Sequence, residues 1–224
     1  MPTIAASLAA IRSTLPEGVE LVAVSKFHPS EAVAEAYAAG QRAFGESRVQ
    51  ELLAKAAALP ADIRWHFIGH LQTNKVRQLV GSGVVSLIES VDSERLLRLI
   101  DAESERAGVV SRVLVQAHVA AEETKFGFLP DELLGFFASG GYRSLRATHI
   151  CGLMGMASNT DDEGRVAADF AALASLKDAI AAAAPDLRGF DMLSMGMSHD
   201  YPLAIAAGAN LVRVGTAIFG DRDY

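Results

Sequence analysis

Cysteine is nearly absent from this 224-residue chain, which contains Cys151 alone. No internal disulfide can form, and a chain of this kind suits a reducing cytoplasm. Cys151 lies in an apolar stretch, 149–156, where we expect a buried structural thiol rather than a reactive nucleophile. Long hydrophobic runs are also missing, and residues 1–15 lack the basic start and continuous apolar core of a secretion signal. We therefore expect a cytoplasmic protein that is neither secreted nor inserted in a membrane.

Basic residues are scarce, since 20 Lys and Arg oppose 27 Asp and Glu for a net charge of −7. No basic stripe is present that would bind nucleic acid or an anionic membrane surface. Half of the residues are hydrophobic, which supplies a sizeable core and excludes intrinsic disorder. No linker rich in Pro, Gly or Ser divides the chain, so we expect residues 1–224 to form a single domain that binds a small molecule.

Eight short runs rich in Val, Ile and Phe alternate with helical patterns along the chain. The predicted strands are 20–25, 42–45, 65–69, 84–89, 112–119, 147–153, 190–194 and 211–214. The predicted helices between them are 29–39, 46–57, 72–80, 93–107, 130–138, 199–207 and one that begins at a capping box of Thr160 and Glu163. A further helix, with Ile4, Leu8 and Ile11 on one face, precedes the first strand.

This alternation indicates an α/β fold built from eight strand–helix units of about 28 residues each. Consecutive parallel strands need right-handed helical crossovers, and eight such units close into a (β/α)8 TIM barrel, here with an extra N-terminal helix. An open, doubly wound sheet is the alternative architecture. It predicts a glycine-rich phosphate loop after the first strand, whereas residues 25–29 (SKFHP) contain no glycine.

Lys26 follows the first predicted strand directly, at the end of the barrel where active sites lie. Partial desolvation at the mouth of an apolar core favours the neutral, nucleophilic amine. Such a lysine can form a Schiff base with a carbonyl compound. Its position alone does not distinguish a reactive lysine from an exposed or salt-bridged one, so both interpretations stay open at this point.

The ends of the seventh and eighth predicted strands have the pattern of a phosphate site. Ser198, Gly215 and Thr216 stand there, in the loops where TIM barrels frequently bind phosphate through free backbone N–H groups. Two hydroxyl groups and a glycine that permits close approach of the backbone suit this role. Ordinary helix capping would use the same residue types.

A reactive lysine and a phosphate site on opposite sides of the barrel mouth together fit pyridoxal 5′-phosphate (PLP), whose aldehyde and phosphate lie on opposite sides of one ring. Arg213, two residues before Gly215, could then meet the pyridine nitrogen. Because a guanidinium keeps its proton, it would donate to an unprotonated ring nitrogen and weaken the cofactor as an electron sink. Met154 is a further candidate contact for the ring.

Several motifs extend the pattern over nearly the whole chain. They are AVSK at 23–26, FGE at 44–46, VQE at 49–51, WHFIG at 65–69, LQ at 71–72, NK at 74–75, LSMGMS at 193–198 and RVGTAIFG at 213–220. In this order they resemble the pyridoxal phosphate homeostasis protein family, whose barrel is similar to the N-terminal domain of alanine racemase. The resemblance implies a fold-type III PLP-binding barrel in which Lys26 forms the Schiff base. Its implied cofactor contacts are Ser194, Ser198, Arg213, Gly215 and Thr216, with Arg213 at the ring nitrogen.

Three positions need separate mention. Ser47 stands where members of this family often have Asn, and His28 where they often have a second Lys. Lys125 matches a family lysine that is proposed to take part in cofactor handling, although an exposed loop lysine is usually only solvated. His66 and His70 lie four residues apart on a strand and its loop, which is not the helical spacing of a metal site, and we expect no metal.

The resemblance implies a protein that stores, buffers or delivers PLP, without evident catalysis. The alternative is a PLP-dependent, racemase-like enzyme, which needs a second acid–base group on the face of the cofactor opposite Lys26. In alanine racemase an additional domain supplies that group, whereas this sequence ends at Tyr224 after the eighth unit. A phosphosugar-processing barrel whose lysine attacks a substrate carbonyl is the third interpretation. We expect PLP as cofactor, transient contact with apo forms of PLP-dependent enzymes, and a monomer.

Overall fold

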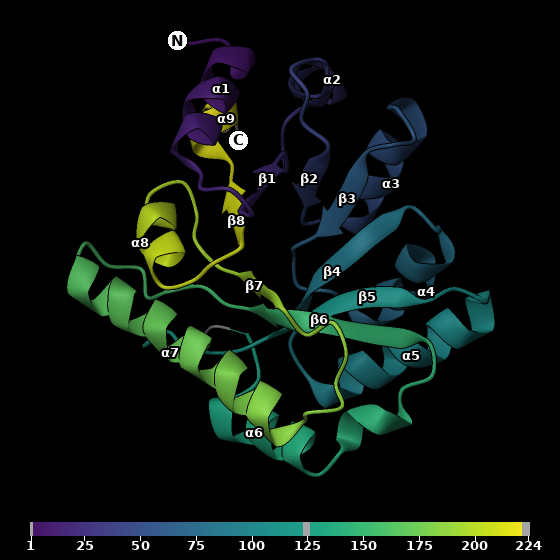
Figure 1. Ribbon diagram of the computed structural model, residues 1–224. Helices are drawn as coiled ribbons and strands as arrows, with labels where there is room; N and C mark the ends of the chain where they lie inside the picture. The colour runs from purple at the N-terminus through teal and green to yellow at the C-terminus, as the bar shows by residue number, and fades with distance from the viewer. Residues whose placement is uncertain (1, 123–125, 221–224) are drawn as a thin grey trace.

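Eight parallel strands close into a barrel in the order β1 to β8, with helices outside it (Figure 1). The computed structural model describes residues 2–122 and 126–220. The strands are β1 (Glu20–Val24), β2 (Ala43–Glu46), β3 (Arg64–Phe67), β4 (Val85–Val91), β5 (Ser111–Gln116), β6 (Thr148–Met154), β7 (Met192–Ser194) and β8 (Leu211–Val214). Because β1 pairs with both β2 and β8, the sheet has no free edge. The predicted TIM barrel is confirmed, and the alternative of an open sheet is wrong.

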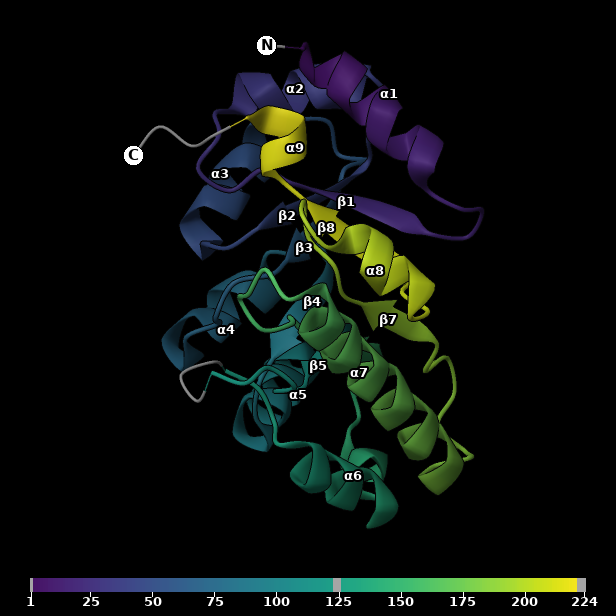
Figure 2. The same ribbon diagram turned by 90° about the vertical axis from the view of Figure 1, so that its left-hand side faces the viewer.

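Helices follow the strands around the outside of the barrel (Figure 2). They are α1 (Ile4–Thr14), α2 (Ser30–Ala38), α3 (Val49–Ala58), α4 (Thr73–Gly81), α5 (Glu94–Ala107), α6 (Pro130–Ala138), α7 (Glu163–Ala183), α8 (Tyr201–Ala206), α9 (Thr216–Phe219) and the 3₁₀ helix η1 (Gly141–Ser144). The predicted N-terminal helix is α1, which buries Leu8 and Ile11 and packs beside α2 and α9. Within the described ranges, no helix combines the length and the apolar character needed to cross a bilayer.

The predicted start of α7 is wrong by a few residues. Asp162 is the N-cap, and its carboxylate accepts hydrogen bonds from the backbone N–H groups of Gly164 and Arg165. The Thr160 hydroxyl, two residues earlier in the chain, instead accepts from the N–H of Asp162. A carboxylate caps as well as a hydroxyl does, and its negative charge also interacts favourably with the helix dipole. Asp162 therefore displaces Thr160 as the cap.

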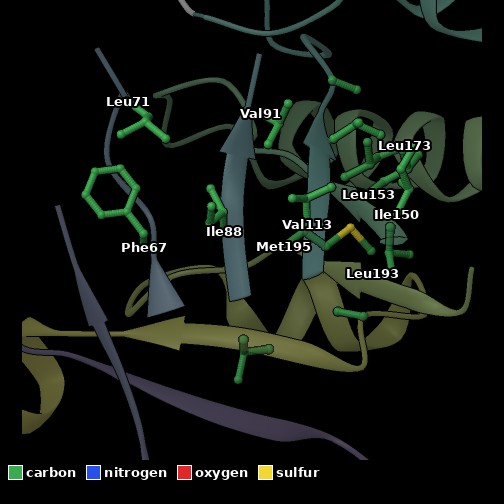
Figure 3. Packing of buried hydrophobic residues seen from close by; sticks show 14 of the residues in the cluster. Phe67, Leu71, Ile88, Val91, Val113, Ile150, Leu153, Leu173, Leu193 and Met195 are labelled. Carbon is green, nitrogen blue, oxygen red and sulfur yellow. The ribbon is translucent and has the colours of Figure 1, made fainter. Parts of the chain in front are cut away.

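Two layers of buried hydrophobic residues stabilise the barrel. The larger lies between the strands and the surrounding helices, where residues such as Ile88, Val113 and Leu173 pack together (Figure 3). The smaller fills the inside of the barrel and consists of Val22, Ala43, Leu87, Leu114, Cys151, Met154 and Leu211. Cys151 is 1% exposed, which confirms the expected buried thiol. Burial of each Leu or Val contributes roughly 1.5–3 kcal/mol, so both layers are substantial.

The inside of the barrel changes from apolar to polar toward the carboxyl ends of the strands. Side chains alternate along a strand, so a residue two places beyond an inward-pointing one also points inward. Leu87, Leu114 and Leu211 belong to the apolar layer, and two places after them come Glu89, Gln116 and Arg213, all buried. The strands therefore deliver buried polar groups to the end of the barrel where a site is expected.

Candidate functional site

A cavity of about 230 Å³ opens at the carboxyl ends of the strands. Its walls come from β1, β6, β8 and the loops that follow β3 and β7. It is lined by six of the seven residues predicted to bind the cofactor: Lys26, Met154, Ser198, Arg213, Gly215 and Thr216. Segments from both ends of the chain therefore meet at one place because β1 and β8 are neighbours in the closed barrel.

The apolar part of the cavity wall consists mainly of side chains that are not predicted from the sequence as cofactor contacts. Val24, Ile68, Met156 and Met197 line it together with Met154. A flat aromatic ring could lie against such a surface, since thioether groups pack well against ring edges and adapt to irregular shapes.

Lys26 is half-buried in the turn between β1 and α2, and its side chain lines the cavity. Phe27, the next residue, has a φ angle of 68° and is the one non-glycine residue with positive φ in the described part of the chain. A bulky side chain is rarely found in this left-handed region, and such conformations gather at functional sites. The backbone directly after the predicted reactive lysine is therefore held in an unusual conformation.

Arg213 is 5% exposed, and it donates hydrogen bonds to the buried residues Ser194 and Gly155. Its Nη1 donates to the hydroxyl of Ser194 and its Nη2 donates to the carbonyl oxygen of Gly155 at 3.0 Å. Nη1 also lies 3.7 Å from Oε2 of Glu89. Burial lowers the pKa of the guanidinium while the charge of Glu89 raises it, and the net shift is downward. These contacts fix the plane and direction of the guanidinium at the cavity wall.

Glu89 is completely buried and connects Arg213 to His66. Its Oε2 accepts a hydrogen bond from Ser194, and its Oε1 lies 2.7 Å from Nδ1 of His66. Burial works against ionisation of this carboxyl, but the hydrogen bond with His66 and the charges of His66 and Arg213 outweigh it and hold the pKa of Glu89 below its ordinary value. Glu89 is thus kept as the anion that balances the buried guanidinium.

Neither Glu89 nor His66 is predicted from the sequence as a partner in this network. A carboxylate at the end of the apolar run 84–89 and an arginine within LVRV were both signals, because buried charges are nearly always paired. Their pairing depends on β4 and β8 facing each other across the barrel, which the individual strands do not reveal. Ser194, the seventh predicted contact, is not among the cavity-lining residues; it lies beneath the wall, between Arg213 and Glu89.

Ser198 connects the loop after β7 to the start of α9. Its hydroxyl accepts hydrogen bonds from the backbone N–H groups of Gly215, at 3.2 Å, and Ala217, at 3.5 Å. The residue therefore caps α9, which comes after the next strand, rather than α8, which follows it in the sequence. The hydroxyl groups of Ser198 and Thr216 thereby lie at one wall of the cavity, with the N–H groups of Gly215 and Ala217 held by Ser198.

Gly215 lies at a point of close backbone approach. A Cβ atom there would lie 3.2 Å from the carbonyl oxygen of Val24 and 3.3 Å from its Cβ. Both distances are tighter than most real contacts of a Cβ, so a side chain would push β1 and β8 apart. The absence of a side chain keeps the loop after β8 against β1, the strand that precedes Lys26.

His28 and Ser47, which were also singled out in the sequence, do not line the cavity. His28 stacks on Phe219 with 5.1 Å between the ring centroids. Ser47 belongs to the loop after β2, where its backbone packs against Gly69 so closely that any side chain at residue 69 would overlap it. Lys125 lies outside the described residues.

His66 and His70 interact with different partners. His66 lies against Glu89, as described above, whereas Nδ1 of His70 is 2.9 Å from Oδ2 of Asp92 and its ring stacks on Phe126. In the ranges that the structure describes, no group of three or more His, Cys, Asp or Glu side chains is placed to hold a metal ion.

Three kinds of chemical group line the cavity. Lys26 supplies an amine, Arg213 a fixed cationic donor, and the loops after β7 and β8 supply the hydroxyl groups of Ser198 and Thr216. An amine can attack a carbonyl carbon, and clustered neutral donors with a nearby cation can bind an anion such as phosphate. The arrangement therefore suits a small molecule that carries both an aldehyde and a phosphate.

Comparison with known proteins agrees with this chemistry. A family model described as "Alanine racemase, N-terminal domain" matches residues 1–223. The "Pyridoxal phosphate homeostasis protein" of Schizosaccharomyces pombe is 38% identical over 229 residues, which cover 99% of this chain and 94% of that protein.

Solved structures extend the comparison. PipY of Synechococcus elongatus PCC7942, solved without PLP, has a TM-score of 0.92 and 41% identity, covering 97% of this chain and 100% of PipY. With PLP bound, PipY has a TM-score of 0.88 and 40% identity over the same shares of both chains. Alanine racemase from Streptomyces coelicolor A3(2) is 24% identical with a TM-score of 0.75, and this chain covers 57% of it, which shows a common barrel fold.

Proposed function

The chain belongs to the pyridoxal phosphate homeostasis protein family, and on this premise we propose that it binds PLP in the cavity between β1 and β8 and holds it covalently on Lys26. The meeting of Lys26, Arg213 and the loops after β7 and β8 around one cavity is the observation that carries this proposal. The PLP-bound structure of PipY, which is 40% identical over nearly the whole chain, supports it.

The residues of the cavity fit this cofactor. When bound, PLP supplies an aldehyde carbon and a ring that can withdraw electrons. Lys26 would supply the amine for that carbon, so that a C=N bond could form while the aldehyde oxygen leaves as water. Ser198 and Thr216 hold the phosphate through their hydroxyl groups, and Gly215 lets it approach the backbone at the wall where the loop after β8 lies against β1.

Arg213 donates a hydrogen bond to the ring nitrogen in this proposal. Its guanidinium keeps its proton and is oriented by Ser194, Gly155 and Glu89, so it leaves the ring nitrogen unprotonated. An unprotonated ring stabilises a carbanion poorly. This supports storage, buffering or delivery of PLP over rapid turnover of amino acids, as do the names of the relatives. In this proposal Ser194 supports Arg213, and Met154 contacts the ring.

The proposal also covers the domain organisation, oligomeric state, location and partners of the protein. We propose that residues 1–224 act as one domain and as a monomer in the cytoplasm, with apo forms of PLP-dependent enzymes as transient recipients. The single, buried cysteine and the lack of a basic stripe support this setting.

The test of covalent attachment is absorption spectroscopy of the purified protein with PLP, followed by borohydride reduction and peptide mass mapping. We expect a visible band, and a reduced adduct on the peptide that contains Lys26. Lys26→Ala should lose both, whereas Lys177→Ala, on the outer helix α7, should keep both. A reducible adduct at full occupancy in Lys26→Ala would show that another lysine carries the cofactor.

The test against an enzymatic role is incubation of the PLP-loaded protein with a panel of L- and D-amino acids. We expect neither racemisation nor transamination beyond the rate of free PLP. Rapid turnover of any amino acid would overturn the non-enzymatic part of the proposal and favour the racemase-like alternative.

A further inference from the structure

A buried cluster of charged groups lies directly behind the turn that carries Lys26. At its centre is Lys55 of α3, whose side chain is 5% exposed. Its Nζ lies 2.7 Å from Oε1 of Glu46, 2.9 Å from Oε1 of Glu51 and 2.9 Å from the carbonyl oxygen of Ser25. An ammonium group has three protons to donate, so these three acceptors satisfy it completely.

The cluster holds the residue on each side of Lys26. Before it, Ser25 is held twice: its carbonyl accepts from Lys55, and its hydroxyl donates to Oε1 of Glu46 at 2.6 Å. After it, the backbone N–H of Phe27 donates to Oε1 of Glu51 at 2.8 Å. Glu51 therefore connects the far side of Lys26 to the same ammonium that holds the near side.

The conformation of this turn needs such support. Phe27 has a φ of 68°, which is unfavourable for a residue with a bulky side chain and persists only where the surroundings impose it. The hydrogen bond to Glu51 and the Arg48 guanidinium, 4.7 Å above the ring of Phe27, impose it from two sides. A relaxed Phe27 would turn the peptide that follows Lys26 and redirect the lysine side chain.

Stability alone gives little reason for an ionic cluster at this place. The free-energy cost of removing two charges from water is about as large as the stabilisation from their mutual attraction. Apolar residues of similar volume often stabilise a fold as well or better. Charged hydrogen bonds differ from apolar packing in being directional, so they can fix a backbone in one conformation. The charged hydrogen bonds of this cluster hold the backbone on both sides of Lys26.

We propose that Glu51 and Lys55 are positioning residues that fix the turn around Lys26 and so present its amine to PLP for covalent attachment. This inference rests on the proposed function, since it concerns the same lysine and the same cofactor. Neither residue lines the cavity, so both act through the backbone of Ser25 and Phe27 rather than by touching the cofactor.

The experiment compares covalent and non-covalent binding in variants of Glu51. Its side chain is 21% exposed, so Glu51→Ala should fold, and circular dichroism with thermal melting checks this. Glu51→Gln keeps an oxygen that can accept from the N–H of Phe27. Glu94→Ala is the matched control, because it removes another i,i+4 ion pair of a helix, on α5 with Arg98. Each protein is titrated with PLP and with pyridoxine 5′-phosphate, which lacks the aldehyde.

We expect Glu51→Ala to attach PLP about tenfold or more slowly, since small misplacement of a reacting group has effects of this size. Its affinity for pyridoxine 5′-phosphate should stay within about twofold of the unsubstituted protein, because the cavity walls are unchanged. Glu51→Gln should recover most of the attachment rate, and Glu94→Ala should match the unsubstituted protein in both titrations.

Attachment at the unchanged rate in folded Glu51→Ala would overturn the inference while leaving the proposed function in place. Equal loss of PLP and pyridoxine 5′-phosphate binding would also overturn it, since the cluster would then only hold the fold. Failure of the unsubstituted protein to attach PLP would overturn the proposed function, and the inference with it.

Discussion

The guanidinium of Arg213 and the carboxylate of Glu89 lie 3.7 Å apart inside the barrel, although they come from strands on opposite sides of it, β8 and β4. Ser194 of β7 bridges them, donating to Glu89 and accepting from Arg213. The charge pair and the serine that bridges it thus connect three strands beneath the cavity wall. In our proposal it also decides the protonation of the cofactor ring, because Arg213 can act as a rigid donor only while its charge is balanced.

Glu89→Gln tests this pair at neutral pH. The substitution keeps the shape of the side chain but leaves the buried Arg213 cation without its counter-ion, so we expect a loss of roughly 3–5 kcal/mol in the free energy of unfolding. Urea denaturation monitored by circular dichroism measures it. Glu94→Gln, which breaks an exposed pair with Arg98, should change the free energy by less than about 1 kcal/mol. Similar small effects for both variants would contradict the assignment of a buried ion pair.

The pH dependence of stability provides a second test of Glu89. Its pKa is lowered in the folded protein from the ordinary value of 4.5, so the unfolded chain binds the proton more readily. Its contribution is therefore fully present above pH 4.5 and is lost as the pH falls through the lower folded value. Glu46 acts in the opposite direction, because burial, only partly offset by Lys55, raises its pKa.

Urea midpoints measured between pH 3 and 7 should separate these two contributions. We expect the unsubstituted protein to lose stability below about pH 4.5 more steeply than Glu89→Gln, which has no proton to take up at this position. Because Glu46 is present in both proteins, its opposite effect cancels in the comparison. Parallel midpoint curves for the two proteins would show that Glu89 is not held as the anion.

Much of the fold can be predicted from local patterns in the sequence. The alternation of apolar runs with helical stripes predicts all eight strands, and the lack of glycine after β1 argues correctly against an open sheet. The errors concern the ends of elements, where capping groups compete: Asp162 instead of Thr160 begins α7. The four-residue helix α9 is too short to leave a periodic pattern.

In the candidate site too, some residues can be predicted from local sequence, whereas the contacts between distant residues cannot. Lys26, Gly215 and Thr216 lie within two residues of strand ends, so the general position of active sites in barrels is enough to select them. The connections of Arg213 to Glu89 and of Lys55 to Glu46 and Ser25 are contacts between distant parts of the sequence. They depend on register and closure of the barrel, which no window of local sequence contains.

Gly215→Ala should weaken binding of phosphate-bearing ligands. The added Cβ would press on the carbonyl oxygen and Cβ of Val24, and overpacking of this kind costs about 1–3 kcal/mol. We expect a lower thermal midpoint and weaker binding of both PLP and pyridoxine 5′-phosphate. Gly135→Ala is the control: it lies within α6 with nothing near its Cβ, and it should stabilise the helix by about 0.5–1 kcal/mol. Unchanged affinity in Gly215→Ala would exclude this wall as the phosphate site.

Lys55→Met should be strongly destabilising, whereas Lys55→Met combined with Glu46→Leu should not. The single change leaves the carboxylate of Glu46, which is fully buried, without its cation, and breaking such a pair costs roughly 3–5 kcal/mol. Removing both charges replaces the pair with apolar groups, which is often neutral or stabilising. The two single variants and the double variant form a thermodynamic cycle measured by urea denaturation.

The double variant is the informative member of that cycle because it separates the fold from the position of Lys26. We expect its free energy of unfolding to return to within about 1–2 kcal/mol of the unsubstituted protein, since the buried charge is gone. Covalent attachment of PLP should nevertheless remain slow, because the carbonyl of Ser25 has lost the ammonium that holds it and its hydroxyl has lost its acceptor. A double variant that recovers both stability and attachment rate would show that hydrophobic packing alone can place the lysine.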